Sequence, residues 1–497
     1  MAGPVDSWLY VSNEPWIRIS LMIYSAKYLR RDWISAMRLC ADSGQRLVTY
    51  HLISLGCPKN LVDSEEMMAS LAMSGMALVD DPEEADVLIV NTCGFIRAAR
   101  EESHAVVAEQ IDIKARHPGQ RVIVTGCLVQ HDRGDLLRRL PAIDAALDLR
   151  EQHNIPEVIQ RLLGLPPNGY LMDNGPFVPR LLATQPHLAY LRIADGCLHQ
   201  CSFCTIPRIR GKLCSRPIEA VLTEARALAA GGVRELVLIA QDTTSYGYDL
   251  YGQFRLVDLL EAMEDIDGLQ WIRLMYTYPT LFDRRLIQHF HQSHKLCSYV
   301  DLPVQHGDPE ILAAMRRGTT ASHLLRLIDR LREARKGITL RTSVIVGFPG
   351  ETETHFTNLM RFLEQTKFDR VGVFCYSHEE GTPAATLPSP VPPHIQEERV
   401  LRLHDWAADQ ALERHRRFQG SLLRVLVDHR DPEDRHYWWG RWEGQAPEVD
   451  GRVRFRGSRV RSGQFVSARI TAADEDNLYG ICVEPSCRGP GKDGACK

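Results

Sequence analysis

The stretch that decides the fold reads CLHQCSFC at residues 197–204 and places Cys197, Cys201 and Cys204 in one short loop. Cysteine thiolates are the usual ligands of iron–sulfur clusters, and full ligation of a cluster takes four of them. This loop lacks a fourth cysteine, since the next one, Cys214, lies beyond a turn. Three thiolates leave one iron open for a small molecule, as catalytic metal sites keep an open position.

Two other interpretations of this triplet stay open at this point. His199 or Cys214 would supply the fourth ligand of a zinc site, or the three cysteines would be buried structural residues. The spacing favours an iron–sulfur cluster over zinc without deciding between them.

The pattern Cys-x-x-x-Cys-x-x-Cys, which follows a strand-like run at residues 189–194, resembles the cluster loop of radical S-adenosylmethionine enzymes. The resemblance implies that the open iron binds the methionine end of S-adenosylmethionine. It also implies that an electron from the cluster cleaves this cofactor to a 5'-deoxyadenosyl radical, which abstracts hydrogen from inert carbon atoms. Because the cofactor supplies this chemistry, the protein has to bind it, orient it and exclude water.

The chain has 497 residues, of which 44% are hydrophobic and 25% charged, and this composition supports about three domains. No apolar run approaches the length of a membrane span. The formal charge of −4 gives no general attraction to nucleic acid. The thirteen cysteines do not resemble the framework of a small secreted domain, so we expect a reducing cytoplasm.

Three segments of the first domain have the pattern of a buried strand that runs into a cysteine, namely Cys57, Cys93 and Cys127. The cysteines are 36 and 34 residues apart, which matches one strand–helix unit each. The carboxyl ends of parallel strands share one crevice in open α/β sheets, where ligands bind. Each cysteine alone would be a small buried hydrophobe, but the threefold repetition favours a second cluster.

This arrangement resembles that of methylthiotransferases, whose amino-terminal domain holds an auxiliary four-iron, four-sulfur cluster through three such residues. The strings SLGCPKNLVDSE at 54–65 and NTCGFI at 91–96 resemble the RimO group, which modifies a ribosomal protein. The tRNA-modifying branch typically lacks the Pro-Lys pair and the Gly-Phe-Ile. The resemblance implies two cluster sites, whose ligands are Cys57, Cys93 and Cys127 for the auxiliary cluster and Cys197, Cys201 and Cys204 for the radical cluster.

Six strand patterns alternate with helical patterns in the central domain, at residues 190–194, 235–241, 271–276, 298–304, 340–346 and 371–376. Six units resemble the open sixfold barrel of radical S-adenosylmethionine enzymes. Active sites of parallel barrels form at the carboxyl ends of the strands. By this analogy, the candidates for binding the cofactor are Gln241, Asp242, Gln305, Gly347 and Gly350.

The last domain changes to short β patterns after a charged helical pattern at residues 394–418. It resembles the TRAM domain of this family, a small five-stranded barrel that holds the macromolecular substrate. Residues 421–480 contain ten arginines, ten acidic residues and no lysine, whereas an RNA-binding module should be basic. This balance favours a basic ribosomal protein as the partner, with residues 474–476 as an acidic contact.

We therefore predict an α/β protein with an open parallel α/β domain, a partial (β/α)6 radical S-adenosylmethionine barrel and a small β-barrel. The first expected part is an extension (1–47) outside the fold, which would be either the product of an upstream start codon or a helical arm at 23–39. The others are the methylthiotransferase domain (48–165), a linker (166–186), the radical barrel (187–418), the TRAM domain (419–482) and a disordered tail (483–497).

The function implied by the resemblance is the addition of a methylthio group to the β-carbon of an aspartate in the twelfth small-subunit ribosomal protein. One S-adenosylmethionine would supply the methyl group and another the radical. We expect a cytoplasmic monomer that uses two 4Fe-4S clusters and an electron donor and sulfur source that the sequence does not identify. Two rivals stay open: a tRNA adenosine methylthiotransferase and a non-catalytic zinc-binding scaffold.

Overall fold

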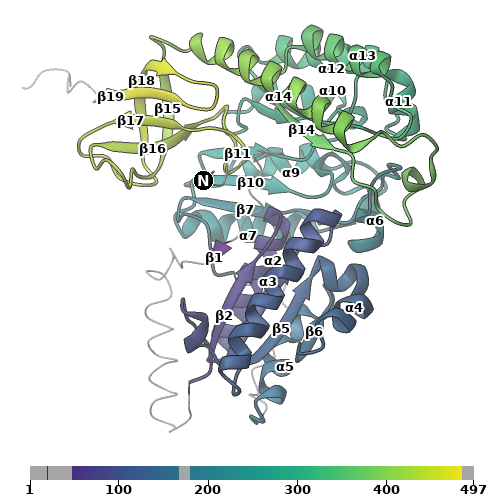
Figure 1. Cartoon of the computed structure of the whole chain (residues 1–497). Helices are drawn as coiled ribbons and strands as arrows, with labels where there is room; N and C mark the ends of the chain where they lie inside the picture. The colour runs from purple at the N-terminus through teal and green to yellow at the C-terminus, as the bar shows by residue number, and fades with distance from the viewer. Residues whose placement is uncertain (1–18, 21–46, 167–179, 484–497) are drawn as a thin grey trace, which may run out of the picture. The chain divides into compact units, whose positions relative to one another are not determined.

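The computed structural model describes residues 19–20, 47–166 and 180–483 (Figure 1). The chain divides into two compact units, Met1–His404 and Asp405–Lys497. The first unit contains two parallel β systems, and the second contains one closed barrel that is antiparallel except for one parallel strand pair. The predicted helical arm at 23–39 and the predicted tail beyond residue 483 lie outside the described residues.

The first parallel system is an open sheet with the strand order β3-β2-β4-β5-β6. Its strands are β2 (Thr49–Ser54), β3 (Ala77–Leu78), β4 (Val87–Thr92), β5 (Arg121–Gly126) and β6 (Ala145–Leu147). This arrangement confirms the predicted open parallel domain. One difference is that β1 (Ile19–Ser20), from the predicted extension, pairs antiparallel with β2.

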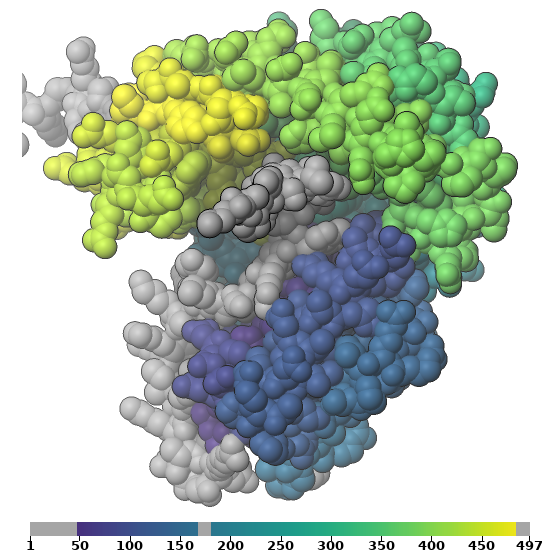
Figure 2. All heavy atoms as spheres, viewed as in Figure 1, coloured from purple at the N-terminus to yellow at the C-terminus, as the bar shows by residue number. Residues whose placement is uncertain are grey.

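The order of these strands is that of a doubly wound sheet, in which the direction of winding reverses beside the first strand. Helix α2 (Pro58–Met73) connects β2 to β3. Helix α3 (Arg97–Arg116) connects β4 to β5, and α4 (Cys127–Arg139) connects β5 to β6. Right-handed crossovers therefore place α2 and the α3–α4 pair on opposite faces. Figure 2 shows the side chains of α3 and α4 covering much of the sheet on one face. Helix α5 (Ile155–Leu162) packs beside α2.

The second parallel system has six strands in chain order, as predicted for an open sixfold barrel. Two three-stranded sheets, β7-β10-β11 and β12-β13-β14, are linked by a parallel bridge between Ile272 and Leu296. The strands are β7 (Leu188–Arg192), β10 (Glu235–Ile239), β11 (Trp271–Leu274), β12 (Tyr299–Asp301), β13 (Thr339–Val346) and β14 (Arg370–Cys375).

Helices cover this second system, and four of those described begin after a residue whose side chain caps the helix, namely Asp283, Asp308, Thr320 and Thr352. The longer ones are α7 (Ile218–Ala230), α9 (Leu256–Met263), α10 (Arg284–Gln292), α12 (Ala321–Ala334) and α13 (Glu353–Thr366). Shorter elements lie in the loops at the strand ends: β8 (Ala194–Asp195), α6 (Ile206–Ile209), β9 (Cys214–Ser215), η3 (Thr243–Ser245), α8 (Tyr248–Tyr251) and α11 (Pro309–Ala314).

The second unit is a closed five-stranded barrel in the order β15-β16-β17-β19-β18. Its strands are β15 (Leu422–Arg430), β16 (Tyr437–Trp442), β17 (Val453–Arg456), β18 (Phe465–Ala473) and β19 (Leu478–Val483). Inward side chains such as Val425, Val453 and Phe455 form its core. The barrel confirms the predicted small β domain, and the long helix α14 (Pro393–Arg416) precedes it in the chain.

Over the described part of the chain, none of the helices is both long enough and apolar enough to cross a membrane.

Candidate functional site

The three cysteines of the first domain lie at the same edge of its sheet. Cys57 precedes the first residue of α2, Cys93 directly follows β4, and Cys127 is the first residue of α4 after β5. Cys93 and Cys127 are buried, and Cys57 is partly exposed. All three therefore occupy carboxyl ends of parallel strands, and Cys57 and Cys93 flank the point between β2 and β4 where ligands bind in doubly wound sheets.

Two glycines beside these cysteines allow the loops to touch. A Cβ atom on Gly56, whose φ is +93°, would lie 2.8 Å from the Cβ of Cys93. A Cβ atom on Gly94 would lie 2.5 Å from the carbonyl oxygen of Cys127. Since real side-chain atoms never approach so closely, only glycine permits this packing. The three loops thus meet at one place, which fits a shared ligand.

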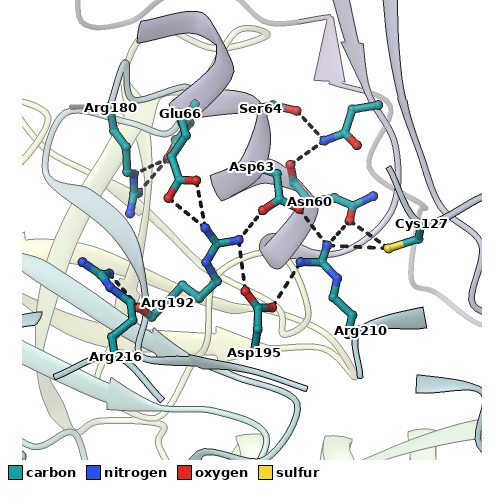
Figure 3. A network of polar contacts seen from close by, with 12 residues as sticks. Asn60, Asp63, Ser64, Glu66, Cys127, Arg180, Arg192, Asp195, Arg210 and Arg216 are labelled. Atoms are coloured by element: carbon teal, nitrogen blue, oxygen red, sulfur yellow. Dashed lines mark hydrogen bonds and ion pairs between the residues drawn. The ribbon is translucent and has the colours of Figure 1, made fainter. Parts of the chain in front are cut away.

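Arg210 lies beside this place and reaches it from the second parallel system (Figure 3). Its Nη2 donates to Asn60 Oδ1 and to Asp63 Oδ2, both at 2.7 Å, and lies 3.6 Å from the sulfur of Cys127. Burial raises the pKa of the Cys127 thiol to about 11, although Arg210 opposes the shift, and it also raises the pKa of Cys93. Thiols shielded from water in this way become thiolates when they bind metal.

A network of ion pairs joins α2 to β7 and β8 around the same place (Figure 3). Arg192 on β7 pairs with Asp63 and with Glu66, whose carboxylate lies at 2.8 Å. Asp195 on β8 accepts a hydrogen bond from Arg210 at 3.1 Å and lies 3.5 Å from Arg192. These contacts hold the first half of α2, which is buried despite its polar side chains, against the second system.

Arg180 belongs to the segment predicted as a linker. It lies 2.7 Å from Glu65 on α2 and 2.6 Å from Glu224 on α7, and its side chain is 2% exposed. Glu224 also pairs with Arg216 at 2.6 Å. Arg180 could not be predicted from the sequence, because its partners lie 44 and 115 residues away and such pairs leave no local pattern.

Cys197, Cys201 and Cys204 lie in the loop that follows β8, and all three are partly exposed. The backbone N–H of His199 donates to the sulfur of Cys197 at 3.4 Å, and Arg317 Nη1 donates to the sulfur of Cys201 at 3.5 Å. Burial raises the pKa of Cys197 to about 11 and that of Cys204 to about 12. This loop therefore presents three thiols together with hydrogen-bond donors aimed at sulfur.

The two cysteine sites are joined directly by a hydrogen bond. Thr205, which follows Cys204, donates its hydroxyl to the carbonyl oxygen of Phe95 at 2.9 Å. Phe95 lies two residues beyond Cys93. A single short contact thus connects the two cysteine loops within the first unit.

The structure gives little support to the zinc alternative. His199 Nε2 lies 2.7 Å from Asp242 Oδ2, and its ring stacks on Tyr278 with centroids 3.5 Å apart. Cys214 is exposed on β9. Within the described ranges, no group of three or more His, Cys, Asp or Glu side chains is arranged around a single metal ion. Ligands of a multi-iron cluster bind different irons, so they need not converge on one point.

The two neighbouring cofactor candidates after β10 differ in their contacts. The carboxylate of Asp242 accepts hydrogen bonds from the backbone of Thr244 at 2.9 Å and from the hydroxyls of Thr244 and Ser245, besides its contact with His199. The side chain of Gln241 bonds to Asp195, but its Oε1 has no hydrogen-bond partner in the described structure. Gln241 is therefore the one with a free polar group.

The remaining candidates lie at the ends of later strands. Gln305 has a left-handed backbone (φ +72°) and is partly exposed. A Cβ atom on Gly347 would collide with the side chain of Gln396, whereas the space beside Gly350 is open. Gly350 therefore allows a ligand to approach its backbone. At Gly347 the space that a side chain would need is already occupied by Gln396 of α14.

His306, next to Gln305, is completely buried, and its Nδ1 accepts the backbone N–H of Asp308 at 2.9 Å. Burial lowers its pKa to about 3. This geometry indicates a structural role for His306.

The family profiles that match the chain follow its domains. Residues 49–148 match Uncharacterized protein family UPF0004, residues 191–363 match the Radical SAM superfamily, and residues 420–483 match the TRAM domain.

Curated relatives match nearly the whole chain. Ribosomal protein uS12 methylthiotransferase RimO of Desulforamulus reducens is 45% identical over 435 residues, which cover 86% of this chain and 98% of the relative. The chain belongs to the RimO family. The RimO of Synechococcus sp. is 44% identical over 460 residues, covering 91% of this chain and 98% of the relative. Membership of the RimO family confirms the resemblance carried by the strings at 54–65 and 91–96.

A solved structure supports the fold. The radical S-adenosylmethionine methyltransferase TsrM from Kitasatospora setae, with cobalamin and a 4Fe-4S cluster bound, aligns with a TM-score of 0.50 and 16% identity. The alignment covers 68% of this chain and 77% of TsrM. At this identity the likeness concerns the fold and not the reaction.

Proposed function

We propose that this chain is a radical S-adenosylmethionine enzyme that adds a methylthio group to ribosomal protein uS12. The observation that supports it most is the pair of three-cysteine sites connected by the hydrogen bond from Thr205 to Phe95. Methylthio transfer to carbon needs one site that generates a radical and another that holds sulfur. Relatives named as uS12 methylthiotransferases share 42–45% identity with the chain.

The proposed cofactors are two 4Fe-4S clusters and S-adenosylmethionine, and the donor sets fit them. Cys197, Cys201 and Cys204 would hold the radical cluster, and the auxiliary cluster would be held by Cys57, Cys93 and Cys127. When bound, these groups supply the electron, the radical and the sulfur chemistry. Each triplet offers three thiols, which leaves one iron for a small molecule.

The protein's own part is to position and tune these groups. Arg317 and Arg210 place N–H donors at the sulfurs of Cys201 and Cys127. Hydrogen bonds to cluster sulfur are one means of setting the reduction potential. The free Oε1 of Gln241 and the open backbone of Gly350 would bind S-adenosylmethionine, as polar groups at strand ends do in parallel barrels.

The proposed target atom is the β-carbon of one aspartate in uS12, a protein of the cytoplasmic translation machinery. In the second unit, Arg454 on β17 pairs with Asp431, and Asp474 accepts hydrogen bonds from Tyr479 and from two backbone N–H groups. Internal pairing of arginines and acids supports a protein partner over a polyanion such as tRNA.

The test is mass spectrometry of uS12, combined with nucleoside analysis of tRNA, from cells with and without this gene. We expect the methylthio mass increment on uS12 to disappear while tRNA stays unchanged. Loss of a methylthioadenosine from tRNA with an unaltered uS12 would instead support the tRNA-modifying alternative.

Metal analysis of the anaerobically purified protein tests the two cluster sites separately. We expect about eight irons and matching sulfide per chain, and a loss of about half of them in Cys93→Ala and in Cys201→Ala. The exposed Cys214 supplies the matched control, since Cys214→Ala should keep all the iron. Stoichiometric zinc without sulfide would contradict the cluster assignment.

A further inference from the structure

A buried lysine extends from one cysteine site to the strand ends of the other. Lys59 lies two residues after Cys57 and is 7% exposed. Its Nζ atom lies 3.5 Å from the centre of the Tyr276 ring and 3.4 Å from the carbonyl oxygen of Ala240. Ala240 directly follows β10, and Tyr276 lies two residues beyond β11. The ammonium group is therefore at the carboxyl ends of the strands, beside Gln241.

This ammonium group forms no ion pair in the described part of the chain; burial lowers its pKa, and the charges of Cys57, Asp195 and Asp301 oppose that shift from further away. Its contacts are a carbonyl oxygen and an aromatic ring, both neutral. Asp63, Glu65 and Glu66 lie on the same helix, but each of them pairs with an arginine. Lysine is rarely buried without a partner, because an unpaired charge away from water is costly. The site therefore favours an anion that comes from outside the chain.

The backbone that carries the ring beneath the ammonium group is held by two hydrogen bonds. Tyr276 has a left-handed backbone (φ +57°), which is unfavourable for a bulky residue. Its N–H donates to Asp301 Oδ2 at 2.9 Å, and its carbonyl oxygen accepts the N–H of Thr243 at 3.0 Å. The aromatic face attracts the cation without neutralising it. The Lys59 ammonium group therefore lies against a ring that attracts its charged form, which counteracts the lowering of its pKa by burial.

We propose that Lys59 binds the carboxylate of the aspartate that is modified, and thereby holds its β-carbon between the two cysteine sites. This inference rests on the proposed function. The β-carbon is bonded directly to the carboxyl carbon, so binding the carboxylate positions the reacting atom. The methionine part of S-adenosylmethionine also carries a carboxylate. We assign Lys59 to the substrate because it lies in the first turn of α2, two residues after Cys57, where the sulfur is to be held.

The test measures binding of a peptide from the target loop of uS12, with aspartate or asparagine at the modified position, to cluster-loaded enzyme. Wild type should bind the aspartate peptide ~10- to 100-fold more tightly, as expected for loss of one charge-assisted contact. Lys59→Gln should bind both peptides equally, and Lys59→Arg should keep the preference. The control is Lys336→Gln, an exposed lysine before the amino end of β13, which should behave like wild type.

Two results would overturn the proposal. One is equal binding of both peptides by wild type, which requires no variant to fold or to load its clusters. The other is a preference for aspartate that persists in Lys59→Gln while its affinity for S-adenosylmethionine falls, because the lysine would then serve the cofactor. Iron content and cluster spectra verify that each variant is loaded. A different result would overturn the proposed function, namely that the wild-type enzyme does not modify uS12 at all.

Discussion

Gln241 and Asp242, which follow β10, have different roles because they differ in how many of their side-chain oxygens accept hydrogen bonds. Asp242 and Gln241 were equal candidates in the sequence, because both are polar and follow the same strand. Asp242 is saturated by the groups around η3 and by His199, so it orders the loop. Gln241 keeps a free oxygen.

We expect Gln241→Ala to weaken binding of S-adenosylmethionine about tenfold, since one hydrogen bond to a charged group is worth roughly 1.5 kcal/mol, and to lower the free energy of unfolding by at most about 1 kcal/mol through loss of the bond to Asp195. Asp242→Ala should lower the free energy of unfolding by about 1–3 kcal/mol, because it leaves several buried donors unpaired. Equilibrium dialysis and urea titration measure the two effects. The same loss of affinity without loss of stability in Asp242→Ala would contradict this division of roles.

His306 makes stability depend on pH. Its pKa of about 3 in the folded protein lies below the usual value of 6.5, so the unfolded chain binds the extra proton first as the pH falls. Stability is therefore lost progressively below pH 6.5, by about 2 kcal/mol at pH 5. We expect His306→Gln to lose correspondingly less stability between pH 7.5 and pH 5 in urea titrations. The exposed His294 is the control, and an identical pH profile for both variants would refute the assignment.

At the scale of elements, local patterns predicted most strands and little of what joins them. The strands β4 and β10 are completely buried and therefore consist mostly of apolar residues. Such short apolar runs can be recognised in the sequence. The meeting of Lys59 with Tyr276 joins residues more than two hundred positions apart, and no periodicity encodes it. The same is true of the close approach between Gly347 and Gln396. The places of Cys93 and Cys127 could be predicted because each directly follows such a strand, and Cys57 follows β2 after two residues.

The segment that contains Arg180 has a structural role that its loop-like composition conceals. We expect Arg180→Met to lower the free energy of unfolding of the first unit by about 3–5 kcal/mol, because Glu65 and Glu224 would lose a buried partner. Arg138→Met, which removes an exposed pair with Asp135, should cost at most about 1 kcal/mol. Thermal unfolding followed by circular dichroism measures both, and equal costs would contradict the burial argument.

At the scale of the whole molecule, two units with separate cores predict two unfolding events. In the second unit, Arg441 is buried and makes two hydrogen bonds of 3.0 Å to Asp428. Asp428→Ala should therefore lower the stability of the small barrel by about 3–5 kcal/mol and leave the first unit unchanged. Calorimetry of the full chain should show one shifted transition, and a joint shift of both would mean that the units unfold together.

The ion pairs around α2 also limit which domains of related proteins can be recombined with one another. The helix begins beside one ligand of the sulfur site, and its carboxylates are matched by arginines that lie more than a hundred positions later. A chimera that joins the first domain to the barrel of a distant relative would bury the carboxylates of α2 without the arginines that pair with them. The two catalytic halves are therefore expected to evolve as one inseparable module, whereas the small terminal barrel, with its own core, is free to be exchanged.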